Sequence, residues 1–419
     1  MPIPLRKPTE RGWWCIQQSA GNSHFEPYPG SGGPLCSGMT DLCLPTAVNG
    51  LGTPLPAATR LTPYLDFDVS QAVAAYRRLA AALPGTALHY AVKANPDQTL
   101  LAALATAGCR FDVASPAEIT AALVAGASAG DLVYSNPVKR REDVRFAARL
   151  GVDLFVVDSP GEVAKVAGAA PGSGVLCRLV TSGEGSDWPL SRKYGCSTGE
   201  AVTILREAAR LGLRADGISF HVGSQQRDPE AWHRPISAAA SVFGVLRAEG
   251  LDPWLLDLGG GFPARLDDGC PPPEEYGAAI ERHLSAAFGD HRPTTIAEPG
   301  RGIAADAGVL VTTVIGVVHR GGTRWVFLDA GVFSGLVETL EEAIRYPLAT
   351  DVPGPTGPCV LAGPTCDSAD VLYQDQMVEL PLALAEGDQV RLHCAGVYVS
   401  TYSTVGFNGF APLSSVVRP

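Results

Sequence analysis

The sequence predicts an α/β fold, in which a TIM-like (β/α)8 barrel is followed by a C-terminal, mainly β domain. Two observations lead to this prediction. Between residues 89 and 300, eight short apolar runs alternate with Ala-rich segments whose apolar residues recur at helical spacing. After Arg301 the apolar runs continue, but few helical segments separate them, which is typical of a mainly β domain.

The barrel is predicted from its short, regular crossovers. One intervening helix, at residues 201–211, has apolar residues at 201, 204, 205, 208 and 211, and most such helices begin after Ser, Pro, Asp or Thr. Eight βα units fit into about 240 residues, and parallel strands joined in this way close into a barrel without leaving an edge. The predicted strands are residues 89–94, 110–114, 132–136, 154–158, 175–180, 217–223, 254–260 and 294–300.

The chain of 419 residues is expected to divide into three parts. Residues 1–58 are rich in Gly, Pro and Ser without sustained periodicity, and we interpret them as an extension. Residues 59–305 form the barrel, and residues 306–419 form the β domain, which a strand at 61–67 joins. The predicted strands of the β domain are residues 309–318, 325–328, 360–361, 377–380 and 389–394.

Composition and charge exclude several functional classes. Apolar residues make up 46% of the chain and charged residues 18%, so a large core can form. The 32 basic and 43 acidic residues give a net charge of −11, which disfavours nucleic acid and anionic membranes as partners. No apolar run of about 18 residues and no signal-peptide core are present, so we expect a cytoplasmic protein. The ten cysteines form no Cys-x-x-Cys pair and have no His at ligand spacing, so we expect neither a metal site nor a disulfide framework.

Residues whose side chains can take part in catalysis or ligand binding follow the predicted barrel strands. Barrels of this kind place their active sites at these positions. Lys93 follows the first strand, and a lysine desolvated there has a lowered pKa that frees its amine to form a Schiff base. A lysine that only reaches toward the surface would fit the same position. The other polar residues at strand ends are Asp112, Ser135, Asp158, His221, Glu298 and Arg301.

Three glycines suggest an anion site near the seventh and eighth strands. The run Gly259-Gly260-Gly261 lets backbone amides approach a phosphate, although glycines also form tight turns. Arg301 could bind the same phosphate while Glu298 faces a protonated ring nitrogen. His221 could stack on an aromatic cofactor, or it could be a structural histidine of its strand.

Six motifs, in order along the chain, resemble those of the fold-type III pyridoxal-phosphate-dependent decarboxylases, which include ornithine, lysine and diaminopimelate decarboxylases. The resemblance covers about residues 60 to 415 and leaves out the N-terminal extension. The motifs are Tyr90-Ala-Val-Lys-Ala-Asn95, Phe111-Asp-Val-Ala-Ser115, His221-Val-Gly-Ser-Gln225, Gly259-Gly-Gly-Phe-Pro263, Glu298-Pro-Gly-Arg301 and Gly363-Pro-Thr-Cys-Asp367.

The resemblance implies that pyridoxal 5'-phosphate is the cofactor, and it assigns roles to matching residues. Lys93 would hold the cofactor as a Schiff base, with Asp112 and Glu118 supporting it. Glu298 would keep the pyridine nitrogen protonated, and His221 would stack on the ring. The residues that would bind the phosphate are Ser224, Gly259, Gly260, Gly261, Arg301 and Tyr398.

The resemblance also implies a homodimer with two shared active sites. Cys366 and Asp367 would come from the β domain of the partner subunit, with Cys366 as the proton donor to Cα of a small amino-acid substrate. Lys193 and Asp370 match the pair that bridges the family's dimer interface.

The substrate expected from the resemblance is a basic L-amino acid. The run Cys366-Asp367-Ser368 resembles the diamine branch, whose aspartate binds a distal ammonium, and this favours ornithine, giving putrescine in polyamine biosynthesis. Glu341 and Glu342 stand where the family has its second substrate-binding carboxylate. Lysine, diaminopimelate or another diamino acid remain alternatives, as does a non-catalytic regulatory homologue. A related racemase would be expected to face the pyridine nitrogen with Arg in place of Glu298.

Overall fold

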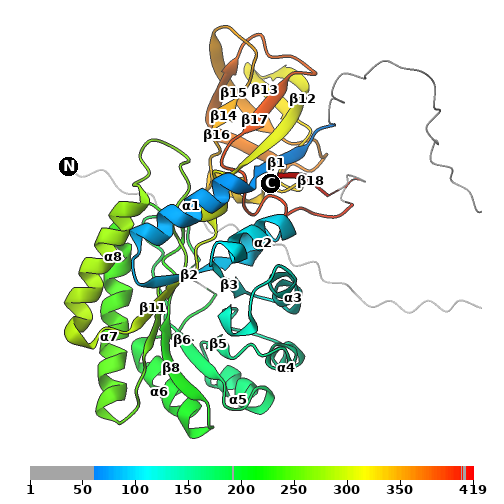
Figure 1. The fold of residues 1–419 in the computed structure, drawn as a ribbon. Coiled ribbons are helices and arrows are strands. Elements are labelled where there is room, and N and C mark those ends of the chain that lie inside the picture. The colour runs from blue at the N-terminus through cyan, green and yellow to red at the C-terminus, as the bar shows by residue number, and fades with distance from the viewer. Residues whose placement is uncertain (1–60, 191–192, 407, 409–411) are drawn as a thin grey trace, which may run out of the picture. The chain divides into compact units, whose positions relative to one another are not determined.

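The computed structural model describes residues 61–190, 193–406, 408 and 412–419 (Figure 1). The predicted extension at residues 1–58 lies outside the described residues. The chain separates into two units, Met1–Thr59 and Arg60–Pro419, and the features below belong to the second unit.

Eight parallel strands form a closed barrel, as the apolar runs predict (Figure 1). The last strand pairs with the first, with Thr295 opposite Thr86, so no edge remains open. Val133, Val156, Leu176, Leu255 and Ile296 form a separate buried cluster contributed by five strands of the barrel. In order around the barrel the strands are β2 (Thr86–Ala91), β3 (Arg110–Val113), β4 (Leu132–Tyr134), β5 (Leu154–Val157), β6 (Gly174–Arg178), β8 (Arg214–Ser219), β10 (Leu255–Asp257) and β11 (Thr294–Ala297).

Helices cover the outside of the barrel (Figure 1), and several begin at side chains that cap them. Asp97 and Ser115 accept backbone N–H groups of the helices that follow them. Ser197 and Glu200 form a reciprocal capping box. The helices are α1 (Val69–Ala82), α2 (Gln98–Thr106), α3 (Pro116–Val124), α4 (Arg141–Arg149), α5 (Pro160–Ala169), α6 (Thr198–Arg210), α7 (His233–Ala248), α8 (Pro273–Phe288) and the short α9 (Arg301–Ala304).

The barrel strands end earlier than predicted, and the residues of chemical interest lie just beyond them. The first strand ends at Ala91 instead of residue 94, and Val92–Ala94 forms a 3-10 turn, η1. The seventh strand ends at Asp257 instead of residue 260, because Gly259 has φ +67°, a left-handed conformation that ends the extended backbone. Lys93 and the glycine run therefore belong to loops at the carboxyl ends of the strands.

An eight-stranded mixed sheet forms the second part, with the main order β14-β17-β12-β13-β15-β16. The predicted N-terminal strand, β1 (Tyr64–Asp68), joins this sheet antiparallel to β12 and parallel to β18. The other strands are β12 (Gly308–Arg320), β13 (Thr323–Leu328), β14 (Leu348–Ala349), β15 (Thr356–Ala362), β16 (Val371–Pro381), β17 (Gln389–Leu392) and β18 (Ser414–Arg418).

Two hydrogen bonds tie the barrel turn at Lys93 to the chain that follows β17. Nδ2 of Asn95 donates to the carbonyl of Gly396 at 3.0 Å, and the backbone N–H of Tyr398 donates to the carbonyl of Ala94 at 2.7 Å. Both residues of the barrel turn are buried. These bonds bring Tyr398 from the C-terminal part of the chain beside the turn that carries Lys93.

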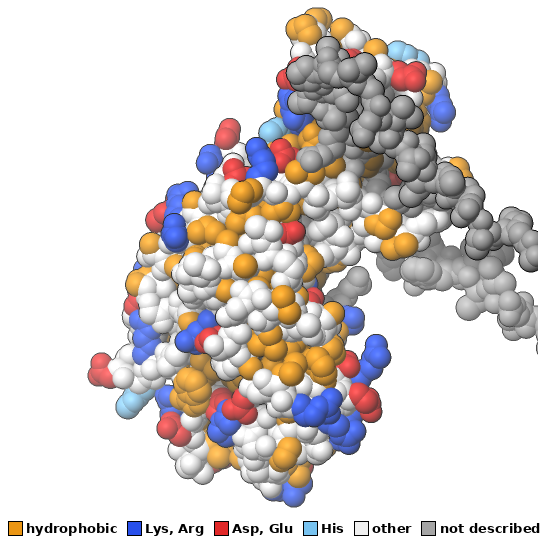
Figure 2. Space-filling view, turned by 45° about the vertical axis from the view of Figure 1, so that its right-hand side comes forward, with side chains coloured by type: hydrophobic (Ala, Val, Ile, Leu, Met, Phe, Trp, Pro, Cys, Tyr) orange, Lys and Arg blue, Asp and Glu red, His pale blue; other side chains and the backbone are white. Residues whose placement is uncertain are grey.

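Acidic and basic side chains are intermixed on the face that Figure 2 shows, so the net charge does not gather there as a field of one sign. In the part of the chain that the structure describes, none of the helices is long and apolar enough to cross a membrane.

Candidate active site

A cavity of about 440 Å³ opens at the carboxyl ends of the barrel strands and contains Lys93. A cleft of about 700 Å³ that includes Thr181, Glu230 and His233 is larger, but it lacks this combination of lysine, acids and aromatic residues. The chemistry of the lining therefore identifies the site better than its size does. The cavity is lined by Lys93, Ala114, Ser135, Asn136, Pro137, Arg178, Trp188, Pro189, Leu190, Lys193, Tyr194, His221, Ser224, Glu298, Glu338, Tyr398 and Tyr402.

Lys93 is held by a carboxylate from the neighbouring strand. Nζ of Lys93 donates to Oδ2 of Asp112 at 2.5 Å, and the hydroxyl of Ser135 donates to Oδ1 of Asp112. Glu118, on α3, accepts the backbone N–H of Ala114 at 2.7 Å, and burial raises the pKa of its carboxyl group. The structure thus brings together Lys93, Asp112 and Ser135, and it places Glu118 at the start of the helix behind them.

The amine of Lys93 is exposed to the cavity but surrounded by charge. Its side chain is 44% exposed because it projects into the cavity, while the side chain of Asp112 is fully buried. Burial in the protein would lower the pKa of the Lys93 ammonium, but the carboxylates of Asp112 and Glu298 outweigh burial and raise it. The positive charge at this position is therefore stabilised, in contrast to the desolvated lysine of lowered pKa that the sequence alone suggested.

His221 lies in the loop after β8 as a neutral ring. Its Nδ1 accepts the backbone N–H of Gly223 at 3.0 Å, so the proton of the neutral ring is on Nε2. Burial, followed by the positive charges of Arg178 and Lys93, lowers the pKa of His221 well below its usual value. A neutral ring with a fixed orientation is suited to lie against a flat aromatic ligand.

The glycine run packs so closely that side chains would not fit. A Cβ atom at Gly259, where φ is +67°, would lie 1.9 Å from the carbonyl oxygen of Phe220. At Gly260 it would lie 2.7 Å from the carbonyl oxygen of Glu298 and 2.9 Å from Nε2 of His221. At Gly261, where φ is +112°, it would lie 2.6 Å from the carbonyl oxygen of Gly223. The three glycines thus leave the backbone beside His221 and Glu298 free of side chains.

Three buried side-chain atoms have no hydrogen-bond partner among the described residues. They are Oε1 of Glu298, Nη1 of Arg301 and Oε2 of Glu338. Burial, and then the charges of Asp112 and Asp257, raise the pKa of Glu298, so its carboxyl group is suited to share a proton with a basic nitrogen. Burial likewise raises the pKa of Asp257 to about 6. A free acceptor on Glu298 and a free donor on Arg301 fit a ligand with a basic ring nitrogen and an anionic group.

Tyr398 completes the wall on the side of Arg301. The guanidinium of Arg301 lies over its ring at 5.2 Å, and the ring of Tyr402 stacks on it at 5.4 Å. Nε of Arg301 donates to the hydroxyl of Ser224 at 3.2 Å. Ser224, Arg301, Tyr398 and the glycine run therefore converge, and together with Lys93, His221 and Glu298 they fit pyridoxal phosphate.

Sequence reasoning missed Arg178, which lies at the end of β6 and lines the cavity. Its guanidinium lies over the ring of Tyr194 at 5.7 Å. An arginine that interrupts the apolar run Val175-Leu-Cys-Arg-Leu-Val180 was the available signal.

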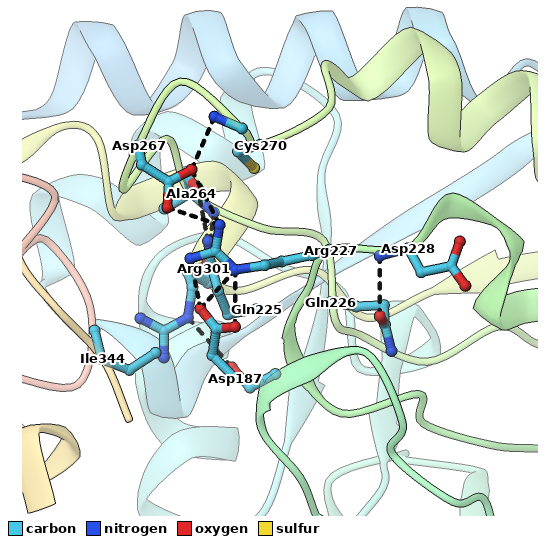
Figure 3. A network of polar contacts seen from close by, with 12 residues as sticks. Asp187, Gln225, Gln226, Arg227, Asp228, Ala264, Asp267, Cys270, Arg301 and Ile344 are labelled. Atoms are coloured by element: carbon cyan, nitrogen blue, oxygen red, sulfur yellow. Dashed lines mark hydrogen bonds and ion pairs between the residues drawn. The ribbon is translucent and has the colours of Figure 1, made fainter. Parts of the chain in front are cut away.

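A polar network joins the chain segments that carry Asp187, Arg227 and Asp267 (Figure 3). Arg227 donates from Nε and Nη2 to Asp187 and from Nη1 to Asp267, at 2.7–3.0 Å. Asp187 belongs to β7 (Ser186–Trp188), which pairs with β9 (Ser224–Gln226). The network therefore links the strand of Trp188 to the strand of Ser224, and both of these residues line the cavity.

Cys366 and Asp367 do not line this cavity. Both are exposed, and Sγ of Cys366 lies 3.7 Å from Oδ1 of Asn408. Asp370 is only 2% exposed, and its carboxylate accepts the backbone N–H groups of Val332 and Thr365 and the hydroxyl of Thr365. Asp370 thus shapes the loop of Cys366. The pairing of Lys193 with Asp370 across a dimer interface stays a prediction.

The acidic segment after β13 is arranged differently from the expectation. Glu341 is exposed, and neither it nor Glu342 lines the cavity. The Glu342 carboxylate accepts the backbone N–H groups of residues 374–376 and pairs with Arg345 at 2.5 Å. Both of its oxygens therefore already have partners within the protein. The acid of this segment that lines the cavity is Glu338, which sequence reasoning missed.

Comparison with known proteins identifies relatives of the whole described unit. A family model described as "Pyridoxal-dependent decarboxylase, pyridoxal binding domain" matches residues 69–305. The chain is 35% identical over 352 residues to a lysine/ornithine decarboxylase of Selenomonas ruminantium, covering 83% of this chain and 88% of that protein.

Two solved structures have the same fold. A lysine/ornithine decarboxylase of Vibrio vulnificus, complexed with putrescine, is 34% identical with a TM-score of 0.77, covering 85% of this chain and 94% of that one. An arginine decarboxylase of Paramecium bursaria Chlorella virus is 30% identical with a TM-score of 0.80, covering 86% and 97%.

Proposed function

Because the chain belongs to the fold-type III family of pyridoxal-phosphate-dependent decarboxylases, we propose that it converts L-ornithine to putrescine by removing the α-carboxyl group. That it is a pyridoxal-phosphate-dependent decarboxylase of a basic amino acid follows from the family and the relatives. The observation that carries the assignment of the site is a cavity lined by Lys93 and Glu298, with the buried Arg301 held directly behind its wall by the lining residues Ser224 and Tyr398. Glu298 and Arg301 each keep one polar atom without a partner among the described residues.

Each residue of the cavity has a distinct task in this proposal. When bound, pyridoxal phosphate supplies an electron sink for the pair left on Cα as carbon dioxide departs. Lys93 would hold the cofactor through Nζ, with Asp112 as the hydrogen-bond acceptor beside it. His221 would lie against the ring, and Glu298 would hold a proton at the ring nitrogen. Ser224, the glycine run, Arg301 and Tyr398 would hold the phosphate.

The proton that replaces carbon dioxide on Cα would come from a second subunit. Cys366 and Asp367 lie on an exposed loop outside their own cavity, so they are free to complete the cavity of a partner. In the homodimer that we propose, Cys366 of the partner subunit donates the proton and Asp367 of the partner subunit receives the distal ammonium of the substrate.

Ornithine is favoured by the acidic character of the proposed distal site. The sequence Cys366-Asp367-Ser368 presents an aspartate for a distal cation, which a diamino acid carries. The similar lysine/ornithine decarboxylase of Vibrio vulnificus was solved with putrescine and with cadaverine, the amines that ornithine and lysine yield. Diaminopimelate is the second candidate, because Arg178 and Lys193 line the cavity and provide the cations that a distal carboxylate requires. Lysine differs from ornithine by one methylene, which a pocket discriminates only weakly.

A substrate panel tests the proposal. Protein purified with pyridoxal phosphate is expected to absorb at about 420 nm, and borohydride is expected to bleach this band. Carbon dioxide release should then be compared for ornithine, lysine, arginine, 2,4-diaminobutyrate and meso-diaminopimelate. Faster turnover of diaminopimelate than of ornithine would reject ornithine as the substrate. A protein that stays colourless with added pyridoxal phosphate would reject the assignment of the cavity as the cofactor site.

A further inference from the structure

A buried ion pair joins the first turn after the barrel to the segment beyond β13. Nη2 of Arg301 donates to Oε1 of Glu338 at 2.6 Å. Their side chains are only 2% and 3% exposed. Glu338 lies on the 3-10 helix η5 (Val337–Glu342), and Arg301 begins α9, so the pair connects two separate elements of the fold.

Three contacts fix the guanidinium of Arg301. Besides Glu338, the hydroxyl of Ser224 accepts from Nε at 3.2 Å, and the ring of Tyr398 lies 5.2 Å below the guanidinium carbon. Nη1 is buried and has no partner in the part of the chain that the structure describes. Because the guanidinium is planar and rigid, fixing Nε and Nη2 also fixes the direction in which Nη1 can donate.

The charge of Glu338 makes this arrangement stable without an anion at Nη1. Burial alone would lower the pKa of Arg301, and the Glu338 carboxylate opposes burial and raises it. A buried cation that loses its partner is strongly destabilised and tends to move or to admit water. Glu338 therefore keeps Arg301 in one position before any ligand binds.

We propose that Glu338 is a positioning residue, which holds Arg301 so that Nη1 faces the phosphate of the cofactor. This inference rests on the assignment of Arg301 to the phosphate in the proposed function. A carboxylate and a phosphate repel each other, so Glu338 acts through Arg301 and not on the phosphate itself.

Comparing two ligands separates this role from a general structural role. Pyridoxal has the ring and aldehyde of pyridoxal phosphate but lacks the phosphate. In apoprotein titrated by absorbance, Glu338→Gln is expected to raise the Kd for pyridoxal phosphate roughly 10- to 100-fold and to leave the Kd for pyridoxal unchanged. Glu338→Asp keeps the charge but withdraws it by one methylene, and it should give a smaller loss of the same kind.

Glu342→Gln is the matched control, because it alters a carboxylate of the same 3-10 helix that binds backbone N–H groups outside the cavity. It should leave both Kd values at the wild-type level. Equal weakening of both ligands by Glu338→Gln, or an unchanged Kd for pyridoxal phosphate, would overturn the inference. If Glu338→Gln does not fold, Glu338→Asp decides by the same two criteria. A wild-type protein that binds no pyridoxal phosphate would instead reject the proposed function.

Discussion

Nζ of Lys93 lies 2.5 Å from Oδ2 of Asp112, and the other oxygen of that carboxylate receives the hydroxyl of Ser135. Lys93 follows β2, Asp112 belongs to β3 and Ser135 follows β4, so three neighbouring strands build one contact. The side chain of Asp112 is shielded from water, whereas that of Lys93 faces the cavity. The carboxylate charge therefore acts on the amine with little solvent screening.

Replacing this carboxylate should change the pH at which Lys93 reacts. In Asp112→Asn the contact partner of Lys93 is neutral, and the loss of an opposite charge at this distance is expected to lower the pKa of the Lys93 ammonium by about one unit or more. The measurement is the rate at which the apoprotein forms the absorbance band with pyridoxal phosphate, as a function of pH. The midpoint of this profile should move to lower pH in the variant.

The exposed residue Asp290 provides the control for this experiment. Asp290→Asn should have the wild-type profile. A profile for Asp112→Asn that coincides with wild type would show that Asp112 does not set the charge state of Lys93.

Adding a side chain to the glycine run Gly259-Gly260-Gly261 should weaken cofactor binding. A methyl group at Gly260 meets the carbonyl oxygen of Glu298 at 2.7 Å and Nε2 of His221 at 2.9 Å, so both groups must move. Gly260→Ala is expected to reduce the affinity for pyridoxal phosphate at least about tenfold and to lower the free energy of unfolding by about 1–3 kcal/mol. Absorbance titration and urea denaturation measure the two effects.

Gly244 provides a matched glycine with open space around its Cβ position, in the exposed face of α7. Gly244→Ala should raise the free energy of unfolding by about 0.5–1 kcal/mol and leave cofactor affinity unchanged. Wild-type affinity of Gly260→Ala for pyridoxal phosphate would contradict the role of the glycine run in binding the cofactor.

Much of the barrel could be predicted because its strands are buried on both faces and are encoded as continuous apolar runs. The strands that escaped prediction are short or polar. The three-residue strand β7 contains Asp187, and β18 begins with two serines. Neither pattern stands out from a loop in sequence.

The acid of the cavity wall could not be predicted from spacing. Residues 338, 341 and 342 are all glutamates, and a helix or a strand would present different ones. The backbone follows neither period there, because Leu340 is extended and both Glu341 and Glu342 have φ values above +50°. This kink turns Glu342 toward the backbone of β16 and leaves Glu338 at the cavity.

Protonation of His89, on β2, should lower the free energy of unfolding as the pH falls. This ring is buried, and burial, together with the charge of Arg110, lowers its pKa from 6.5 to about 4, although the carbonyl of Ala87 partly opposes the shift. The unfolded chain therefore binds this proton at higher pH than the folded protein does. The stability that the neutral ring contributes is complete above pH 6.5 and is lost as the pH falls through 4, by roughly 3 kcal/mol in total.

Urea denaturation between pH 7.5 and pH 4, followed by circular dichroism, checks this sign and size. Many carboxyl groups also titrate in this interval, so the test is the difference between wild type and His89→Gln, whose side chain does not titrate. That difference should shrink as the pH falls. Parallel curves would mean that His89 is not kept neutral by the fold.

The exposed position of Cys366, away from the cavity that contains Lys93, leads to a prediction about subunit exchange. Lys93→Ala removes the attachment point of the cofactor, and Cys366→Ala removes the proposed proton donor, so each homodimer should form little amine product. If the sites are shared, a hybrid of the two variants has one site with both substitutions and one site with neither. Random exchange makes half of the dimers hybrids, so the mixture should recover about one quarter of the wild-type rate of putrescine formation.

Differently tagged subunits, isolated through both tags in sequence, verify that hybrids have formed. Recovery must then follow, because an intact Lys93 and an intact Cys366 meet in one cavity only across the two chains. Purified hybrids without activity would show that each subunit completes its own site.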